Sequence, residues 1–169
     1  GWLEYIHNEP DCEMVALVSR GGPTLDAAKE KWNIADEICY TDYDEMLKRD
    51  DVDAVIVCTN DTTHCDFSVR AMRAGKDVLC EKPMTLNVEE CREMVRVAKE
   101  TGRKLMVGQV CRYAPGFVKA KEIVQKGIIG DLYFVESEYA HDYFGREGVD
   151  DWRADKDREP IIGGACHAI

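Results

Sequence analysis

The segment from Asp53 to Thr59 constrains the fold of this chain more than any other part of the sequence. Its centre is continuously apolar and rich in branched side chains. A half-exposed strand alternates between apolar and polar residues, whereas a parallel strand that is buried on both faces is apolar throughout. A sheet that contains such a strand needs helices on both faces, so this segment predicts an α/β fold.

Strand and helix patterns alternate along the sequence as far as residue 107. The short apolar runs that we expect to form the other strands lie at 14–18, 37–40, 78–80 and 104–107. Helical patterns lie at 1–8, 24–32, 42–49, about 64–74 and 87–101. The buried face of the last helix is expected to carry Cys91, Met94, Val95 and Ala98. The alternation predicts a doubly wound parallel sheet with right-handed crossovers.

The pattern changes after the last of these strands. A helix is expected over 115–126, and apolar and polar residues then alternate from 131 to about 141. Alternation of this kind is typical of a half-exposed strand in an antiparallel sheet. We therefore divide the chain into a first domain over 1–112 and the beginning of a second domain over 113–169.

The composition argues against several classes of partner. The chain has 33 acidic and 22 basic side chains, which leaves no basic surface for nucleic acid or an anionic membrane. No apolar run approaches the ~20 residues that cross a bilayer. The cysteines include no C-x-x-C pair and the histidines are scattered, so no metal site is indicated. No signal-peptide pattern precedes the cysteines, so we expect reduced thiols and a cytoplasmic protein.

Two charges and a proline follow the apolar run at 78–80, namely Glu81, Lys82 and Pro83. Charges are not expected inside a buried strand, but they occur where a strand ends. In open α/β sheets, ligands bind at the carboxyl ends of the strands. Lys82 is therefore the first candidate for catalysis, and the alternative is a pair of solvated loop charges.

Several motifs taken together resemble the glucose–fructose oxidoreductase, inositol dehydrogenase and MocA family. The motifs are Asp53–Thr59, His64, Ala74–Pro83, Val107–Gln109, Arg112–Pro115, Ile129–Asp131 and Trp152-Arg153. The resemblance implies an NAD(P)-binding Rossmann domain followed by an α+β domain with a mostly antiparallel sheet. It implies an NAD(P)-dependent oxidoreductase that acts on a small sugar, cyclitol or related polyol. It also implies a homodimer or homotetramer for the full-length protein.

The resemblance also shows what this sequence lacks. The first domain of the family opens with a strand and a G-x-G-x-x-G loop, and no such motif occurs here. Gly1 is expected to fall in the first helix, after that loop, and the missing strand would be the central strand of the sheet. Fewer residues follow Asp131 than the second sheet needs. We therefore expect the chain to be incomplete at both ends.

The residues after the run at 14–18 indicate the cofactor. In a dinucleotide-binding domain, an acidic residue at this place bonds the ribose of NAD, and a nearby arginine accommodates the extra phosphate of NADP. Ser19 and Arg20 stand here without a carboxylate. We expect NADP, with NAD as the alternative if Arg20 is a plain surface residue.

Other residues are expected to line the cofactor by resemblance to the family. They are Cys58, Thr59, Asn60, His64, Glu81, Lys82, Gln109, Arg112, Trp152 and Arg153. His64 either packs near the nicotinamide or bonds locally, and Asp61 is expected to cap the helix that follows it. Trp152 and Arg153 have a surface cation–π pair as their alternative.

The resemblance assigns catalysis to Lys82 and His167. The family's lysine lies beside the nicotinamide and the substrate hydroxyl, and its peptide bond to the following proline is often cis. Many members have Asp-x-Gly-x-His, but Gly163 stands at the Asp position here. His167 could then act alone, or Asp142 or His141 could replace the carboxylate. The alternative is a structural histidine.

Two other functions remain open from the sequence. A relative could use tightly held NAD for hydrolysis or epimerisation through a transient oxidation. A regulatory protein could instead bind NADP without turnover, and the missing carboxylate at Gly163 favours that alternative.

Overall fold

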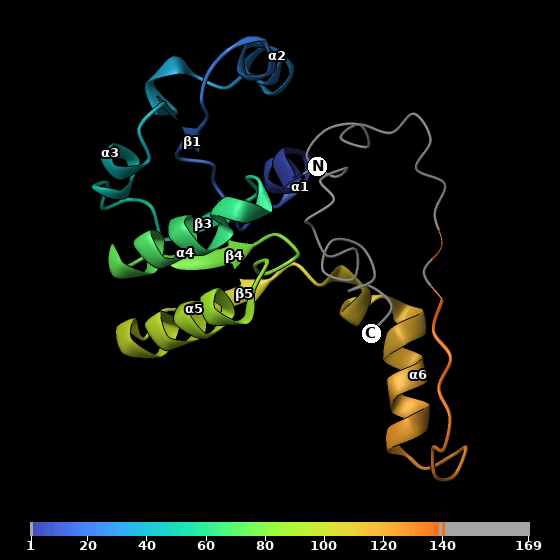
Figure 1. The fold of residues 1–169 in the computed structure, drawn as a ribbon. Helices are drawn as coiled ribbons and strands as arrows, with labels where there is room; N and C mark the ends of the chain where they lie inside the picture. The colour runs from blue at the N-terminus through green and yellow to red at the C-terminus, as the bar shows by residue number, and fades with distance from the viewer. Residues whose placement is uncertain (1, 139, 141–169) are drawn as a thin grey trace.

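Parallel strands and the helices that connect them form the body of the molecule (Figure 1). The computed structural model describes residues 2–138 and 140. The strands are β1 (Leu17–Val18), β2 (Cys39–Tyr40), β3 (Ala54–Val57), β4 (Asp77–Cys80) and β5 (Leu105–Val107). The α-helices are α1 (Trp2–Asn8), α2 (Pro23–Trp32), α3 (Tyr43–Leu47), α4 (His64–Arg73), α5 (Val88–Thr101) and α6 (Pro115–Gln125). Short 3₁₀ turns are η1 (Asp36–Ile38), η2 (Asp61–Thr63) and η3 (Val110–Tyr113).

The sheet is divided into two parts. Strand β1 pairs with β2, and β4 lies between β3 and β5, with every pair parallel. The predicted parallel α/β fold is therefore confirmed. In the doubly wound order, the first strand lies between the second and the fourth. The two parts of the sheet separate at the corresponding place, between β1 and β3.

The core lies where α4 and α5 pack together over β3 and β4. Met72, Cys80, Met94 and Val97 are fully buried there. Burying a side chain such as Met stabilises the folded state by about 1.5–3 kcal/mol relative to leaving it exposed. These four residues thus fix the helices against the strands that carry the predicted site.

The buried face of α5 differs from the expected one. Met94 is buried as predicted, but Val95 is 43% exposed and Val97 is buried in its place. One residue along an α-helix turns by about 100°, which takes Val95 off the face that Met94 occupies. The ends of the helix agree with the prediction, because Asn87 Oδ1 accepts a hydrogen bond from the Glu90 N–H at 2.8 Å and the helix ends at Gly102.

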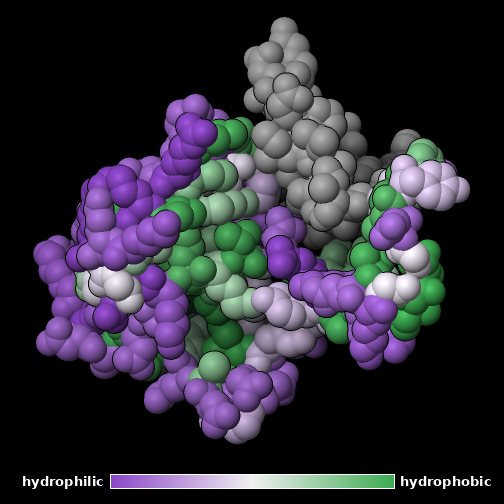
Figure 2. All heavy atoms as spheres, turned by 90° about the horizontal axis from the view of Figure 1, so that it is seen from below, coloured by the Kyte–Doolittle hydropathy of each residue, from purple (hydrophilic) through white to green (hydrophobic). Residues whose placement is uncertain are grey.

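Helix α6 has no buried residue and stands away from the sheet (Figure 1). It presents hydrophobic side chains such as Phe117 and Val118 to solvent. Figure 2 shows hydrophobic surface on the right, where this helix lies. Residues 131–138 form neither helix nor strand, so the alternating strand predicted from 131 is wrong over this range. A strand needs a neighbour to bond its N–H and C=O groups, and no strand of the described residues pairs with this segment.

Candidate cofactor and active site

The carboxyl ends of β3, β4 and β5 lie side by side at one edge of the larger part of the sheet (Figure 1). Val57 is paired with Cys80, and Cys80 with Val107. The ladder continues beyond the strands, because the Glu81 N–H donates to Val57 O and the Gly108 N–H donates to Cys80 O, each at 2.8 Å. Three of the predicted cofactor segments, which are far apart in the sequence, therefore begin next to one another.

The carboxylate of Glu81 is held by two donors of the protein itself. The indole Nε1–H of Trp2 donates to Oε1 at 2.8 Å, across 79 positions of the sequence. The backbone N–H of Lys82 donates to Oε2 at 2.9 Å. Glu81 was expected at the cofactor, whereas Trp2 was not a candidate, since a tryptophan at the start of a helix carries no signal for such a contact.

His64 joins the loops that follow β3 and β4. The residue is 1% exposed. Nδ1 lies 2.7 Å from the carbonyl oxygen of Pro83, and Nε2 lies 3.2 Å from that of Thr59. Of the two roles that the sequence left open for His64, local bonding agrees with these contacts. The peptide bond between Lys82 and Pro83 is cis, as the resemblance implied.

The turn between β3 and α4 is capped by Asn60 and not by Asp61. Asn60 Oδ1 accepts from the N–H and the hydroxyl of Thr62, both at 3.3 Å. Asp61 is 4% exposed and lies inside η2. The capping role predicted for Asp61 is therefore wrong: the extended backbone of Asn60 lets its own side chain reach the N–H two residues on.

Ser19 fixes the turn after β1. Its N–H donates to Tyr40 O at 3.0 Å, and its hydroxyl oxygen accepts from the Gly21 N–H at 3.3 Å. Gly21 has φ of +84°, a backbone conformation that side chains disfavour, so glycine suits this turn. Arg20 projects from the same turn and is exposed, without an ion pair among the described residues.

The remaining described candidates differ in exposure. Lys82 and Gln109 are half-buried, and Arg112 in η3 is exposed. Desolvation, with a smaller contribution from the negative charge of Glu81, raises the pKa of the Cys58 thiol. Cys58 is thus a neutral thiol beside Glu81 and not an activated nucleophile. The other candidates lie outside the described residues: they are Trp152, Arg153 and His167, with Gly163, Asp142 and His141 that were weighed beside them.

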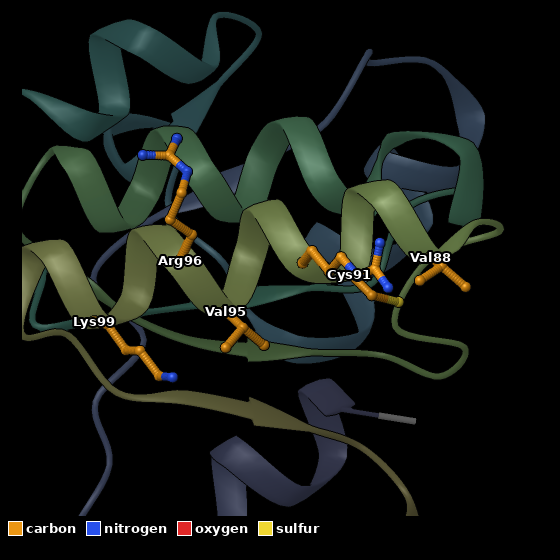
Figure 3. Close-up of a pocket in the computed structure, with 6 residues that line it drawn as sticks. Val88, Cys91, Val95, Arg96 and Lys99 are labelled. Carbon is orange, nitrogen blue, oxygen red and sulfur yellow. The ribbon is translucent and has the colours of Figure 1, made fainter.

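A shallow hollow of about 410 Å³ lies along α5 (Figure 3). It is lined by Val88, Cys91, Arg92, Val95, Arg96 and Lys99. All of these residues belong to one helix, and none is a predicted site residue. Within residues 2–138 and 140, no group of three His, Cys, Asp or Glu side chains is placed to share a metal ion. No helix in this part of the chain is long and apolar enough to span a bilayer.

Comparison with known proteins gives the class of protein. A family model described as an oxidoreductase family with an NAD-binding Rossmann fold matches residues 2–109. The chain therefore belongs to this family, named for glucose–fructose oxidoreductase, inositol dehydrogenase and MocA. The resemblance seen in the sequence is confirmed, and so is the Rossmann-type fold.

Individual relatives extend this assignment. The chain is 41% identical over 85 residues to inositol 2-dehydrogenase of Rhizobium meliloti, covering 50% of the chain and 26% of the relative. It is 37% identical over 106 residues to an alpha-N-acetylgalactosaminidase of Bacteroides fragilis, covering 60% of the chain and 25% of the relative. A structure of the 3-ketoreductase KijD10 of Actinomadura kijaniata with NADP and TDP-benzene is similar with a TM-score of 0.65 and 32% identity, over 76% of this chain and 39% of that one. The chain thus spans less than half the length of these proteins.

Proposed function

We propose that this protein is an NAD(P)-dependent oxidoreductase that moves a hydride between the nicotinamide and a CH–OH carbon of a sugar, cyclitol or related polyol. The observation that carries the proposal is the place of Lys82. It follows Glu81 at the carboxyl end of β4, the strand between β3 and β5, in a chain of the oxidoreductase family. Ligands of open parallel sheets bind at this edge. The similarity to an inositol 2-dehydrogenase supports a polyol as substrate.

The lysine side chain supplies acid–base chemistry. The nicotinamide, when bound, accepts or gives the hydride. Loss of a hydride from a carbinol carbon must be accompanied by loss of the hydroxyl proton, and the Nζ of Lys82 receives that proton or returns it in the reverse direction. His167 is the proposed second acid–base group, because histidine side chains in general can accept or donate a proton near neutral pH.

NADP is the proposed cofactor. Ser19 holds the turn, and Arg20 is exposed beside it, so its guanidinium is available to pair with a phosphate. The NADP in the complex of KijD10 supports this preference. Trp152 and Arg153 are proposed to contact the cofactor. A lower KM for NAD than for NADP would contradict the cofactor proposal.

The homodimer or homotetramer stays a prediction for the full-length protein.

The test is a polyol screen followed at the nicotinamide absorbance, with Lys82→Ala beside the unmodified protein. We expect kcat to fall by about 10²–10⁴-fold, the usual contribution of general acid–base catalysis, while NADP binding is retained. Lys104→Ala is the matched control, because this exposed lysine precedes β5 at the opposite edge of the sheet. A kcat close to normal in Lys82→Ala would refute the role of the lysine.

A second candidate function is favoured by the similarity to the alpha-N-acetylgalactosaminidase. In that case the protein would hold NAD tightly and cleave a glycoside through a transient oxidation of the sugar. The two candidates differ in the net balance of cofactor. Product that forms without release of reduced cofactor would favour the glycosidase, and release in equal amounts would favour the dehydrogenase.

A further inference from the structure

We propose that His64 and Trp2 are positioning residues that hold the two sides of Lys82, and this inference rests on the function proposed above for the lysine. Glu81 and Pro83 flank Lys82 in the sequence. Each of them is hydrogen-bonded to a side chain of a different helix. The carboxylate of Glu81 bonds the indole N–H of Trp2 in α1, and the carbonyl oxygen of Pro83 bonds the ring of His64 at the start of α4.

The bond of His64 to Pro83 has a defined direction. A carbonyl oxygen only accepts hydrogen bonds, so the ring nitrogen that approaches it must carry a hydrogen. The distance from Nδ1 to Pro83 O is 2.7 Å, and that from Nε2 to Thr59 O is 3.2 Å. A neutral imidazole carries a hydrogen on only one of its two nitrogens, and the shorter contact assigns it to Nδ1. Because His64 is 1% exposed, water does not replace this donor, and loss of the N–H leaves the carbonyl of Pro83 without it.

The bond of Trp2 acts on the other side of Lys82. An indole N–H is a donor only, and a carboxylate is a strong acceptor. Trp2 binds one oxygen of Glu81, and the second oxygen accepts from the backbone N–H of Lys82 itself. The carboxylate therefore transmits the position of α1 to the main chain of the lysine.

These hydrogen bonds position the backbone around Lys82, and they do more than fill space in the folded protein. An apolar side chain of similar size would fill the space of either ring, but it would not bond main-chain or carboxylate atoms next to Lys82. Catalysis is sensitive to placement, since a displacement of about 1 Å costs on the order of 100-fold in rate. The structure thus gives the catalytic candidate two supports from outside its own loop.

Three substitutions at His64 test its side of the proposal. His64→Asn keeps an N–H donor near the place of Nδ1, His64→Gln keeps one near the place of Nε2, and His64→Phe keeps none. We expect kcat to fall by about 10–100-fold in the Phe and Gln variants and to recover to within about threefold in the Asn variant, with KM for NADP nearly unchanged. An Asn variant no better than the Phe variant would overturn the assignment of the bond to Nδ1.

Trp2→Phe tests the other side, because it removes the N–H and keeps an aromatic ring. We expect the NMR signal of the Lys82 amide to move and kcat to fall, by less than in His64→Phe, since the second bond to Glu81 remains. His7→Gln is the control for a substitution elsewhere in α1. His7 is exposed, and its ring lies beside that of Trp32. A Lys82 amide signal that does not move in Trp2→Phe would overturn this side.

A measurement that needs no turnover separates this inference from the proposed function. The ¹⁵N resonances of the His64 ring in the unmodified protein report which nitrogen carries a hydrogen. We expect a protonated Nδ1, and a bare Nδ1 would overturn the bond to Pro83. If no polyol is oxidised but Nδ1 is protonated and the Lys82 amide responds to Trp2→Phe, the supports stand and the proposed function fails.

Discussion

The half of the molecule built on β3, β4 and β5 is packed more tightly than the half built on β1 and β2. β3 and β4 each contain two buried residues, whereas both residues of β1 and of β2 are half-buried. Helix α4 buries five of its ten residues, and α2 buries only Leu25. The difference teaches that the burial of a strand follows the helix that covers it, because α4 packs against both β3 and β4 although β3 has a strand neighbour on one side only.

The two halves carry different parts of the proposed site. Lys82 is attached to the tightly packed half, while Ser19 and Arg20 belong to the other. Proton transfer requires a fixed geometry, whereas an exposed arginine pairs with a phosphate from several positions. The packing therefore matches what each part of the site has to do.

The largest expected effect follows from emptying the core of the tight half. Met94→Ala removes a fully buried side chain and should lower the free energy of unfolding by about 2–5 kcal/mol. Leu25→Ala in α2 is the comparison, and at 9% exposure and outside the main cluster it should cost at most about 2 kcal/mol. Urea unfolding monitored by circular dichroism measures both. Equal losses would remove the distinction between the halves.

The next effect concerns the reactivity of thiols. Burial raises the pKa of the Cys80 thiol from 9.0 to about 11. Because the thiolate reacts, Cys80 should be alkylated at pH 8 at least about 100-fold more slowly than a thiol with the ordinary pKa. Exposed Cys12 is the internal comparison, and mass spectrometry locates the label. In urea the two should react at similar rates.

The raised pKa of Cys80 also predicts how stability depends on pH. The unfolded chain loses the proton near pH 9.0 and the folded chain near pH 11. The contribution of this group is therefore fully present below pH 9.0 and is lost as the pH rises towards about 11. A rapid reaction of Cys80 in the folded protein at pH 8 would contradict both expectations.

A smaller effect is expected where the two halves meet. The hydroxyl of Tyr43, in α3, donates to the backbone oxygen of Phe67 in α4 at 2.9 Å, and burial raises the pKa of this hydroxyl. Tyr43→Phe should lower the free energy of unfolding by about 1 kcal/mol, because a part-buried hydrogen bond to the carbonyl of Phe67 is lost. Tyr5→Phe, at 72% exposure, should leave it unchanged within error. An unchanged stability in Tyr43→Phe would show that this bond does not join the halves.

An effect of similar size is expected at a helix end. Asn87→Ala removes the cap of α5 and should cost about 1 kcal/mol, whereas Asn87→Asp should cost little, since both residues cap well. Thermal unfolding of the two variants measures the difference. A similar melting temperature for Ala and Asp at this position would mean that the cap is not used.

Local patterns made much of the tight half predictable. The continuous apolar run that contains β3 and the cap at Asn87 depend on neighbours in the sequence. The buried face of α5 was misassigned at Val95, because four apolar residues in one stretch do not fix which face of the helix points to the core. The alternation from 131 predicted a strand, but pairing depends on a distant partner.

The candidate site was predictable only in part. Resemblance to the family singled out Lys82 and the cis bond to Pro83. The role of His64 stayed open, since both of its ring nitrogens contact backbone carbonyl oxygens in loops that the local sequence does not place beside it. The contact between Trp2 and Glu81 joins residues 79 positions apart, and nothing local signals it.

The central claim is that Lys82 acts at a bound nicotinamide in the transfer of hydride to a carbonyl carbon. The most direct test supplies NADPH with deuterium at the transferred position and a polyol-derived ketone, and follows deuterium in the alcohol product by mass spectrometry. The account predicts one deuterium at the carbinol carbon with the unmodified protein, and a rate lowered by about 100-fold or more in Lys82→Ala while NADPH still binds. Product without deuterium, or an undiminished rate in Lys82→Ala, would contradict it.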